Sequence, residues 1–159
     1  MIISSILENR DVEKRVAITP EIVKKYINLG FDVHVIKNYA NHLGLDDNAF
    51  QESGAKIFDK ESDIIKNSDI IIQLGLLNDN QLSNVKENQI LIGSLNYHQN
   101  MDKIKNLSSK KINMFSLELL PRITRAQSMD VLSSQANLAG YRAVVEAIYE
   151  YEKAVPMMM

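Results

Sequence analysis

The sequence predicts an α/β fold with an open, mostly parallel, twisted sheet and helices on both faces. Short apolar runs rich in isoleucine and valine recur along the 159 residues, and segments with helical spacing lie between them. The run from Asp69 to Leu74 is apolar on both faces, as expected of a central strand that is covered by helices on both sides. No internal repeat or linker divides the sequence, so we expect residues 1–159 to form a single domain.

The sheet is expected to have about five or six strands, and six segments are candidates for them. They are Ile2 to Ile6, Asp32 to Ile36, Lys56 to Phe58, Asp69 to Leu74, Gln89 to Ser94 and Ile112 to Leu117. The first helix has clear end signals, because Thr19 can cap it, Pro20 fits its first turn and Gly30 can end it.

The remaining helices are shorter, with one exception. We expect helices from Asp46 to Ser53, from about Asp59 to Lys66 and from Met101 to Leu107, whereas the signal around Asn78 to Val85 is weak. The last helix, from about Asp130 to Tyr151, is the longest. Its small residues predict close packing against the sheet or a neighbouring domain; they are Ala136, Ala139, Gly140 and Ala143. The apolar tail from Ala154 to Met159 is compatible with an interrupted chain or with a frayed terminus.

Composition excludes several classes of function. The 18 Lys and Arg nearly balance the 20 Asp and Glu, so the chain has no basic surface typical of nucleic-acid binding. There are no cysteines, which excludes disulfides, thiolate zinc sites and cysteine nucleophiles. No leader-like segment or apolar run of about 20 residues is present, so we expect a soluble, cytoplasmic chain.

A self-contained active site is not evident. The three histidines lack the spacing of a metal pair, and no metal site is expected. His34 lies in a predicted strand, and His98 follows the end of another, where α/β proteins bind ligands. No G-x-S-x-G elbow occurs, and the six glycines are isolated from one another. The fold is therefore expected to be Rossmann-like but to lack the glycine-rich turn that holds a pyrophosphate.

One polar segment, from Glu118 to Asn137, leads from the last strand into the longest helix. Arg122, Arg125 and Gln127 supply hydrogen-bond donors, and Ser133 lies near the helix N-terminus. Such a set can bind a carboxamide, a ribose or a phosphate at the carboxyl end of the sheet. In the alternative interpretation, Asp130 and the serines only cap the helix and the arginines are solvated.

The segments from Pro121 to Asp130 and from Leu132 to Val144 resemble the alpha subunit of the proton-translocating NAD(P)⁺ transhydrogenases of the Re/Si-specific type. The stretch from Glu13 to Pro20 resembles the opening motif that this family shares with the alanine dehydrogenases. The end of the chain, from Pro156 to Met159, resembles the point at which the family enters its Rossmann domain.

The resemblance implies direct hydride transfer from NADH, held by the complete subunit, to NADP⁺, held by a separate NADP(H)-binding domain. It also implies a membrane subunit coupled to proton translocation, a homodimeric complete subunit and a place on the cytoplasmic face of the inner membrane. Direct transfer requires aligned nicotinamide rings and no protein acid, base or nucleophile, so polar positioning groups suit it. Because the following Rossmann domain is absent, we expect the isolated chain to be inactive and its polar segment to be exposed and mobile.

The resemblance assigns roles to individual residues. Arg122 and Ser133 would contact the carboxamide or a nearby phosphate, with Arg125 as a further cofactor contact. Gln127 would bridge toward the ribose hydroxyls and the NADP(H) domain, and Asp130 would orient the segment. Arg122, Gln127 and Asp130 are thus the expected catalytic residues.

Arg15 matches the residue that holds the substrate carboxylate in alanine dehydrogenases. The lysine that accompanies it there is missing from Ile72 to Gly75, so a structural role for Arg15 is favoured. Two alternatives remain: the substrate domain of an alanine or saccharopine-type dehydrogenase, or a non-catalytic docking module.

Overall fold

The computed structural model describes residues 1–154, and the chain divides into two compact units, Met1–Leu117 and Glu118–Met159. The predicted entry into a Rossmann domain at Pro156 to Met159 lies outside the described residues.

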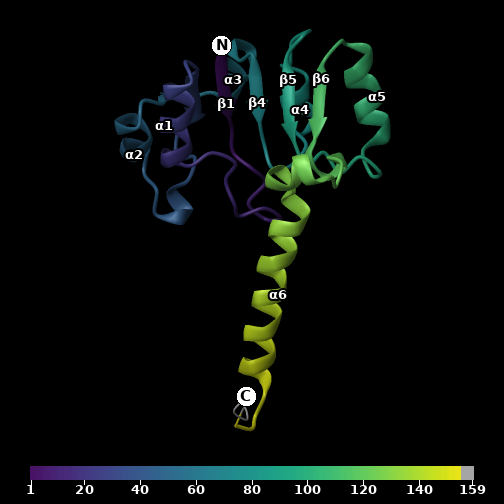
Figure 1. Ribbon diagram of the computed structural model, residues 1–159. Coiled ribbons are helices and arrows are strands. Elements are labelled where there is room, and N and C mark those ends of the chain that lie inside the picture. Colours follow the sequence, from purple (N-terminus) through teal and green to yellow (C-terminus); the bar gives the residue numbers. More distant parts are fainter. Residues whose placement is uncertain (155–159) are drawn as a thin grey trace. The chain divides into compact units, whose positions relative to one another are not determined.

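The first unit is built on a six-stranded sheet in the order β3-β2-β1-β4-β5-β6 (Figure 1). All five strand pairs are parallel, which confirms the predicted sheet. The strands are β1 (Ile2–Ser5), β2 (Asp32–Ile36), β3 (Lys56–Phe58), β4 (Ile70–Ile72), β5 (Ile90–Gly93) and β6 (Asn113–Ser116). Each lies within the segment expected from the sequence.

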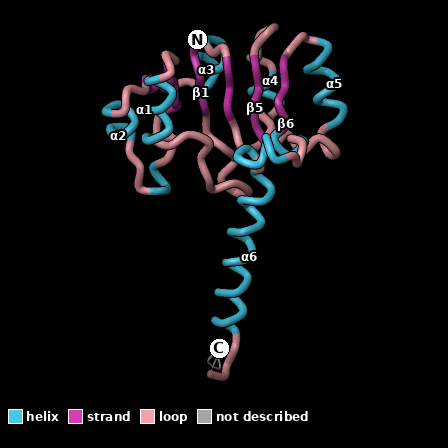
Figure 2. Tube along the Cα trace, in the orientation of Figure 1, coloured by secondary structure: helices cyan, strands magenta, loops and turns pink. Residues whose placement is uncertain are grey.

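Five α-helices flank this sheet (Figure 2). They are α1 (Pro20–Asn28), α2 (Asp47–Glu52), α3 (Glu61–Asn67), α4 (Asp79–Leu82) and α5 (Met101–Ser109), with a 3₁₀ turn, η1 (Asn41–Leu43), before α2. Helix α1 packs with α2, and α3 packs with α4. Because parallel crossovers are right-handed, the reversal of strand order after β3 puts these two pairs on opposite faces of the sheet.

The predicted ends of α1 are confirmed. The Thr19 hydroxyl accepts from the Ile22 N–H at 3.5 Å, Pro20 is the first helical residue, and Gly30 follows the helix with φ of 87°. A positive φ of this size favours glycine because it has no Cβ.

Helix α4 lies in the region where the sequence periodicity is weak. It begins with a reciprocal capping box, in which the Gln81 N–H donates to Asn78 Oδ1 at 2.9 Å and the Asn78 N–H donates to Gln81 Oε1 at 3.0 Å. The end signal, rather than the apolar spacing, identifies this short helix.

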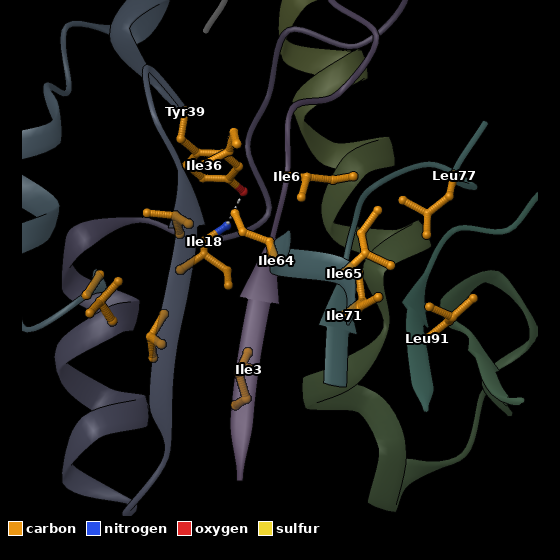
Figure 3. Packing of buried hydrophobic residues seen from close by; sticks show 14 of the residues in the cluster. Ile3, Ile6, Ile18, Ile36, Tyr39, Ile64, Ile65, Ile71, Leu77 and Leu91 are labelled. Atoms are coloured by element: carbon orange, nitrogen blue, oxygen red, sulfur yellow. Dashed lines mark hydrogen bonds between the residues drawn. The ribbon is translucent and has the colours of Figure 1, made fainter. Parts of the chain in front are cut away.

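The core of the first unit is formed by aliphatic side chains from the strands and helices, several of which Figure 3 labels together with the buried ring of Tyr39. Ile71 on β4 is buried, in agreement with its predicted central place, whereas Ile70 and Ile72 are half-buried. The prediction of burial on both faces of this strand is therefore confirmed for its middle residue only.

A buried polar network lies where β1 and β4 end. The Tyr39 hydroxyl accepts from the backbone N–H of Ile18 at 3.2 Å (Figure 3). It also accepts from the backbone N–H of Ala17 at 3.0 Å and bonds to the Ser5 hydroxyl at 2.7 Å. Ser5 in turn donates to Gln73 Oε1 at 2.7 Å. Because every member has a partner, the network fixes the backbone before α1 without leaving buried groups unpaired.

The second unit contains two 3₁₀ segments and a long helix: η2 (Leu117–Leu119, its first residue in the first unit), η3 (Thr124–Met129) and α6 (Val131–Glu150). No residue of α6 is buried, and Leu138, Tyr141 and Ile148 are 58%, 73% and 51% exposed. A Cβ added at Gly140 would meet nothing within 4 Å. The expected close packing along this helix is thus absent from the described residues, because nothing among them covers its small side chains. Within residues 1–154, no helix is both long and apolar enough to span a membrane.

Candidate functional site

The polar segment predicted from the sequence begins the second unit. Arg122 precedes η3, Arg125 and Gln127 lie on η3, and Asp130 connects η3 to α6, whose first turn carries Ser133. The four residues other than Asp130 are exposed, and Asp130 is half-buried, which agrees with the predicted exposure of the segment. Its mobility stays a prediction.

Asp130 is the N-cap of α6. Its Oδ1 accepts from the Ser133 N–H at 3.1 Å, and its Oδ2 accepts from the Ser133 hydroxyl at 2.6 Å. The side-chain hydrogen bond from Ser133 is the main cause that lowers the pKa of Asp130, followed by the backbone hydrogen bond and then by the positive charge of Arg122. Asp130 is therefore a carboxylate at neutral pH.

This arrangement decides what Ser133 can still bind. Its N–H and O–H both point to Asp130, so they are not available to a phosphate, which would also be repelled by the carboxylate. The lone pairs of the Ser133 hydroxyl remain able to accept a hydrogen bond. Of the ligands considered from the sequence, a carboxamide N–H₂ suits this group best.

Arg125 and Gln127 complete the segment. Neither side chain forms a hydrogen bond or ion pair within residues 1–154, and both are exposed. The backbone carbonyl of Gln127 accepts from the Asp130 N–H at 3.3 Å, which closes η3 onto the helix cap. The segment thus combines a fixed element, the Asp130–Ser133 pair, with two free polar side chains that can reach an external ligand.

A second polar group lies at the carboxyl edge of the sheet in the first unit. The Glu8 carboxylate accepts from the backbone N–H groups of Leu74 at 2.6 Å and Gly75 at 3.3 Å, and burial raises its pKa. Sequence reasoning missed this role, since the contact joins residues 66 positions apart. An isolated acidic residue after a strand is its only local sign.

Arg15 is engaged by a residue two positions before it. Its Nε donates to Glu13 Oε1 at 2.8 Å, and its Nη2 donates to Glu13 Oε2 at 2.5 Å. The hydrogen bond from Arg15 is also the main cause that lowers the pKa of Glu13. The guanidinium thus already holds a carboxylate in the manner in which it would bind a small carboxylic acid.

The histidines differ in environment. His98 is exposed after β5, with its ring 5.4 Å from that of Tyr97, whereas His34 is buried in β2. His98 is therefore accessible beyond the carboxyl end of β5. Among residues 1–154, no three His, Asp or Glu side chains gather in a way that could hold a metal ion.

The strand order of the first unit is the order of dinucleotide-binding domains, but the glycine-rich turn after β1 is missing. By its strand order, the first unit is therefore a Rossmann-like domain. The family model for the alanine dehydrogenase/PNT N-terminal domain matches residues 6–139, and the chain belongs to this family.

Within the family, the similarity is to transhydrogenases. The chain is 40% identical over 157 residues to an NAD(P) transhydrogenase subunit alpha polypeptide of Rhodospirillum rubrum, and the match covers 96% of this chain and 41% of the relative. The crystal structure of the transhydrogenase from Sinorhizobium meliloti superposes with a TM-score of 0.91 at 39% identity, covering 100% of this chain and 47% of that one.

An L-alanine dehydrogenase structure shares the fold alone, with a TM-score of 0.69 at 17% identity over 74% of this chain and 32% of that one. The chain therefore spans less than half the length of the relatives that it matches.

Proposed function

We propose that this chain forms the N-terminal portion of the NAD(H)-binding alpha subunit of a proton-translocating transhydrogenase of the Re/Si-specific type. Its role there is to supply the segment that positions the nicotinamide of NADH. The observation that carries this proposal is the Asp130–Ser133 pair, which leaves a hydroxyl acceptor for a carboxamide beside the free side chains of Arg125 and Gln127. The 40% identity to a transhydrogenase alpha subunit supports the assignment.

The proposed reaction moves a hydride, with its two electrons, from C4 of the nicotinamide of NADH to C4 of the nicotinamide of NADP⁺, giving NAD⁺ and NADPH. No proton has to be given or taken by a side chain at the reacting carbons. The residues of this chain act by orientation: Ser133 accepts from the carboxamide, and Asp130 holds the serine in place. Gln127 extends toward the ribose hydroxyls and the NADP(H)-binding domain, while Arg122 and Arg125 supply positive charge nearby.

The proposed partners are the NADP(H)-binding domain, the membrane subunit that couples the reaction to proton translocation, and a second alpha subunit in a homodimer on the cytoplasmic face of the membrane. The exposed apolar surface of α6 supports the need for further polypeptide, since a helix with 73% exposure at Tyr141 and 59% at Val144 is ordinarily covered. The domain that follows in the longer relatives is the proposed cover.

Two observations weigh against an alanine or saccharopine-type dehydrogenase. Arg15, the expected carboxylate-binding residue, is already paired with Glu13, and no lysine lies between Ile72 and Gly75. A small carboxylate substrate would have to displace Glu13 from the guanidinium.

The test joins this chain to the following domain of a transhydrogenase alpha subunit and combines it with the NADP(H)-binding component. NADH carrying deuterium at C4 is supplied with NADP⁺, and deuterium in NADPH is measured by mass spectrometry. We expect label transfer, slowed about tenfold or more by Ser133→Ala, since one oriented contact at the ring is lost.

Ser134→Ala is the matched control, because within residues 1–154 the Ser134 hydroxyl bonds only to the Val131 carbonyl of its own helix, at 3.0 Å. We expect its rate to stay within about twofold of the unsubstituted chain. No label transfer with any NADP(H) component, or equal effects of the two substitutions, would contradict the proposal.

A further inference from the structure

His34 is a buried titratable group that the proposed function does not use. Its side chain is 5% exposed, and neither ring nitrogen has a hydrogen-bond partner within the described chain. The ring stacks on Phe58, with centroids 4.7 Å apart and planes inclined by 37°. A buried imidazole with no acceptor for its N–H is held by packing alone, and its environment opposes the charged form.

The position of His34 in the sheet makes a positive charge on its ring more unfavourable. It lies on β2 in register with Ser4 of β1 on one side and Lys56 of β3 on the other. In-register residues of parallel strands point to the same face, so the Lys56 ammonium lies on the same face as the ring. The Ser4 hydroxyl forms no hydrogen bond with the ring, and its partner is the Ser68 hydroxyl.

The charged groups around His34 shift its pKa in opposite directions. Burial lowers its pKa most, Lys56 lowers it further, and Asp32 on β2 raises it to some extent. None of the charged side chains on the helices packed against β2 forms a hydrogen bond or ion pair with the ring; they are Glu21, Lys24 and Lys25 on α1 and Glu61, Asp63 and Lys66 on α3. The net environment therefore favours the neutral ring.

The strand that contacts the His34 ring through Phe58 is a short edge strand. β3 has only three residues, pairs with β2 alone at the edge of the sheet and supplies both Phe58 and Lys56. Movement of β3 away from β2 would expose the His34 ring to water. The same movement would separate the ring from the Lys56 ammonium group. Local opening at a short edge strand needs far less free energy than unfolding of the unit.

We propose that His34 is an acid-sensitive release for the edge strand β3: protonation of the buried ring opens the contact between β2 and β3 while the rest of the sheet stays closed. The direction of the pH dependence follows from the difference between the pKa of His34 in the open form and in the closed form. The open form takes up a proton near the ordinary pKa of 6.5, and the closed form does so only at lower pH. The opening equilibrium therefore rises as pH falls below about 6.5, by up to about tenfold per pH unit, and levels off below the lowered pKa of the closed form.

The test is native-state hydrogen exchange of the full chain at pH 7 and pH 5, corrected for the intrinsic exchange rates. We expect the protection of the amides of β3 (Lys56–Phe58) to be about tenfold lower at pH 5 than at pH 7, while the amides of β4 (Ile70–Ile72) keep their protection. His34→Phe keeps a planar ring without a titrating group, so the fall should vanish. An equal fall in His34→Phe, or an equal fall in β4, would overturn the proposal.

Two further measurements, the pKa of His34 and the effect of lysine substitutions, do not depend on whether His34→Phe folds. The ring titration of His34, followed by NMR in the unsubstituted chain, should give a pKa below the ordinary value, and Lys56→Met should raise this pKa and weaken the acid-induced exchange. Lys66→Met removes a lysine of α3, which is not an in-register neighbour of His34, and should change neither quantity. An ordinary or raised pKa in the unsubstituted chain, or identical effects of the two lysine substitutions, would overturn the proposal.

Discussion

Gly93 ends β5 at a point where two backbones approach closely, so Gly93→Ala should destabilise the first unit strongly. A Cβ built at Gly93 would lie 2.2 Å from the carbonyl oxygen of Gln73, about 1 Å short of ordinary contact. Gln73 cannot move aside easily. Its N–H donates to the Ile92 carbonyl at 2.9 Å, and its Oε1 accepts from Ser5 and from the Ile6 N–H.

The clash is with backbone, so no side-chain rotation relieves it, and β4 and β5 must separate locally. Overpacking of a well-packed interior costs about 1–3 kcal/mol, and we expect the upper end, about 3 kcal/mol. For a unit of this size, such a loss lowers Tm by about 10 °C. Unfolding in urea, followed by circular dichroism, and calorimetry measure both quantities.

Gly75→Ala is the control, since its added Cβ would meet only the Glu8 carboxylate at 3.6 Å, an ordinary contact. Its loss should stay within about 0.5 kcal/mol. If Gly93→Ala were as stable as Gly75→Ala, the close approach of β4 and β5, and with it the reason for glycine at this position, would be refuted.

Three further substitutions test other features of the molecule. Tyr39→Phe leaves two backbone N–H groups without their acceptor and should lower the free energy of unfolding, measured in urea, by about 2 kcal/mol. The control Tyr26→Phe on α1 should lower it by less than about 0.5 kcal/mol. Equal losses would argue against the buried network. Gln127→Asn in the complete enzyme should slow hydride transfer far more than it weakens NADH binding, because it disturbs ring alignment; equal losses would make it a binding residue only. Gly140→Ala should stabilise α6 in the isolated chain by about 1 kcal/mol, as seen in thermal unfolding, and a loss would mean that a backbone does approach this helix.

The sheet could be predicted because its signals are local. Apolar runs place all six strands, and the residues Thr19, Pro20 and Gly30 mark both ends of α1 with the geometry that the structure has. The capping box of Asn78 and Gln81 shows that a short helix is better found from its end signals than from its periodicity.

Contacts between distant residues could not be predicted in the same way. Nothing near Tyr39 in the sequence indicates Ser5 as its partner, and nothing near Glu8 indicates the Leu74 N–H, because these pairs form only when β1 and β4 are neighbours. The burial of His34, whose ring contacts Phe58, likewise depends on the pairing of β2 with β3.

In the candidate site, the exposure of Arg122, Arg125, Gln127 and Ser133 could be predicted, whereas their role stays a prediction, and the hydrogen bonds between Asp130 and Ser133 were expected only as an alternative to function. Asp130 caps α6, as the structural interpretation expected, and this cap leaves the Ser133 hydroxyl as an acceptor. The two interpretations are therefore compatible. The cover of α6 could not be predicted because a stripe of small residues indicates close packing without naming its partner.

In the proposed division of labour, this chain positions the nicotinamide, whereas the following domain supplies most of the affinity for NADH. The most direct test of this division is a calorimetric titration with NADH of residues 1–159 and of a polypeptide extended through the following domain. No residue of this chain replaces a glycine-rich turn that holds the pyrophosphate, so affinity should come mainly from the next domain. Arg122, Gln127 and Ser133 would contact only the nicotinamide end, and ordering the segment consumes some of that contact energy. We expect no saturation of residues 1–159 up to about 1 mM NADH and clear saturation of the extended polypeptide. Micromolar binding by residues 1–159 alone would contradict the account, because the cofactor site would then lie largely within this chain.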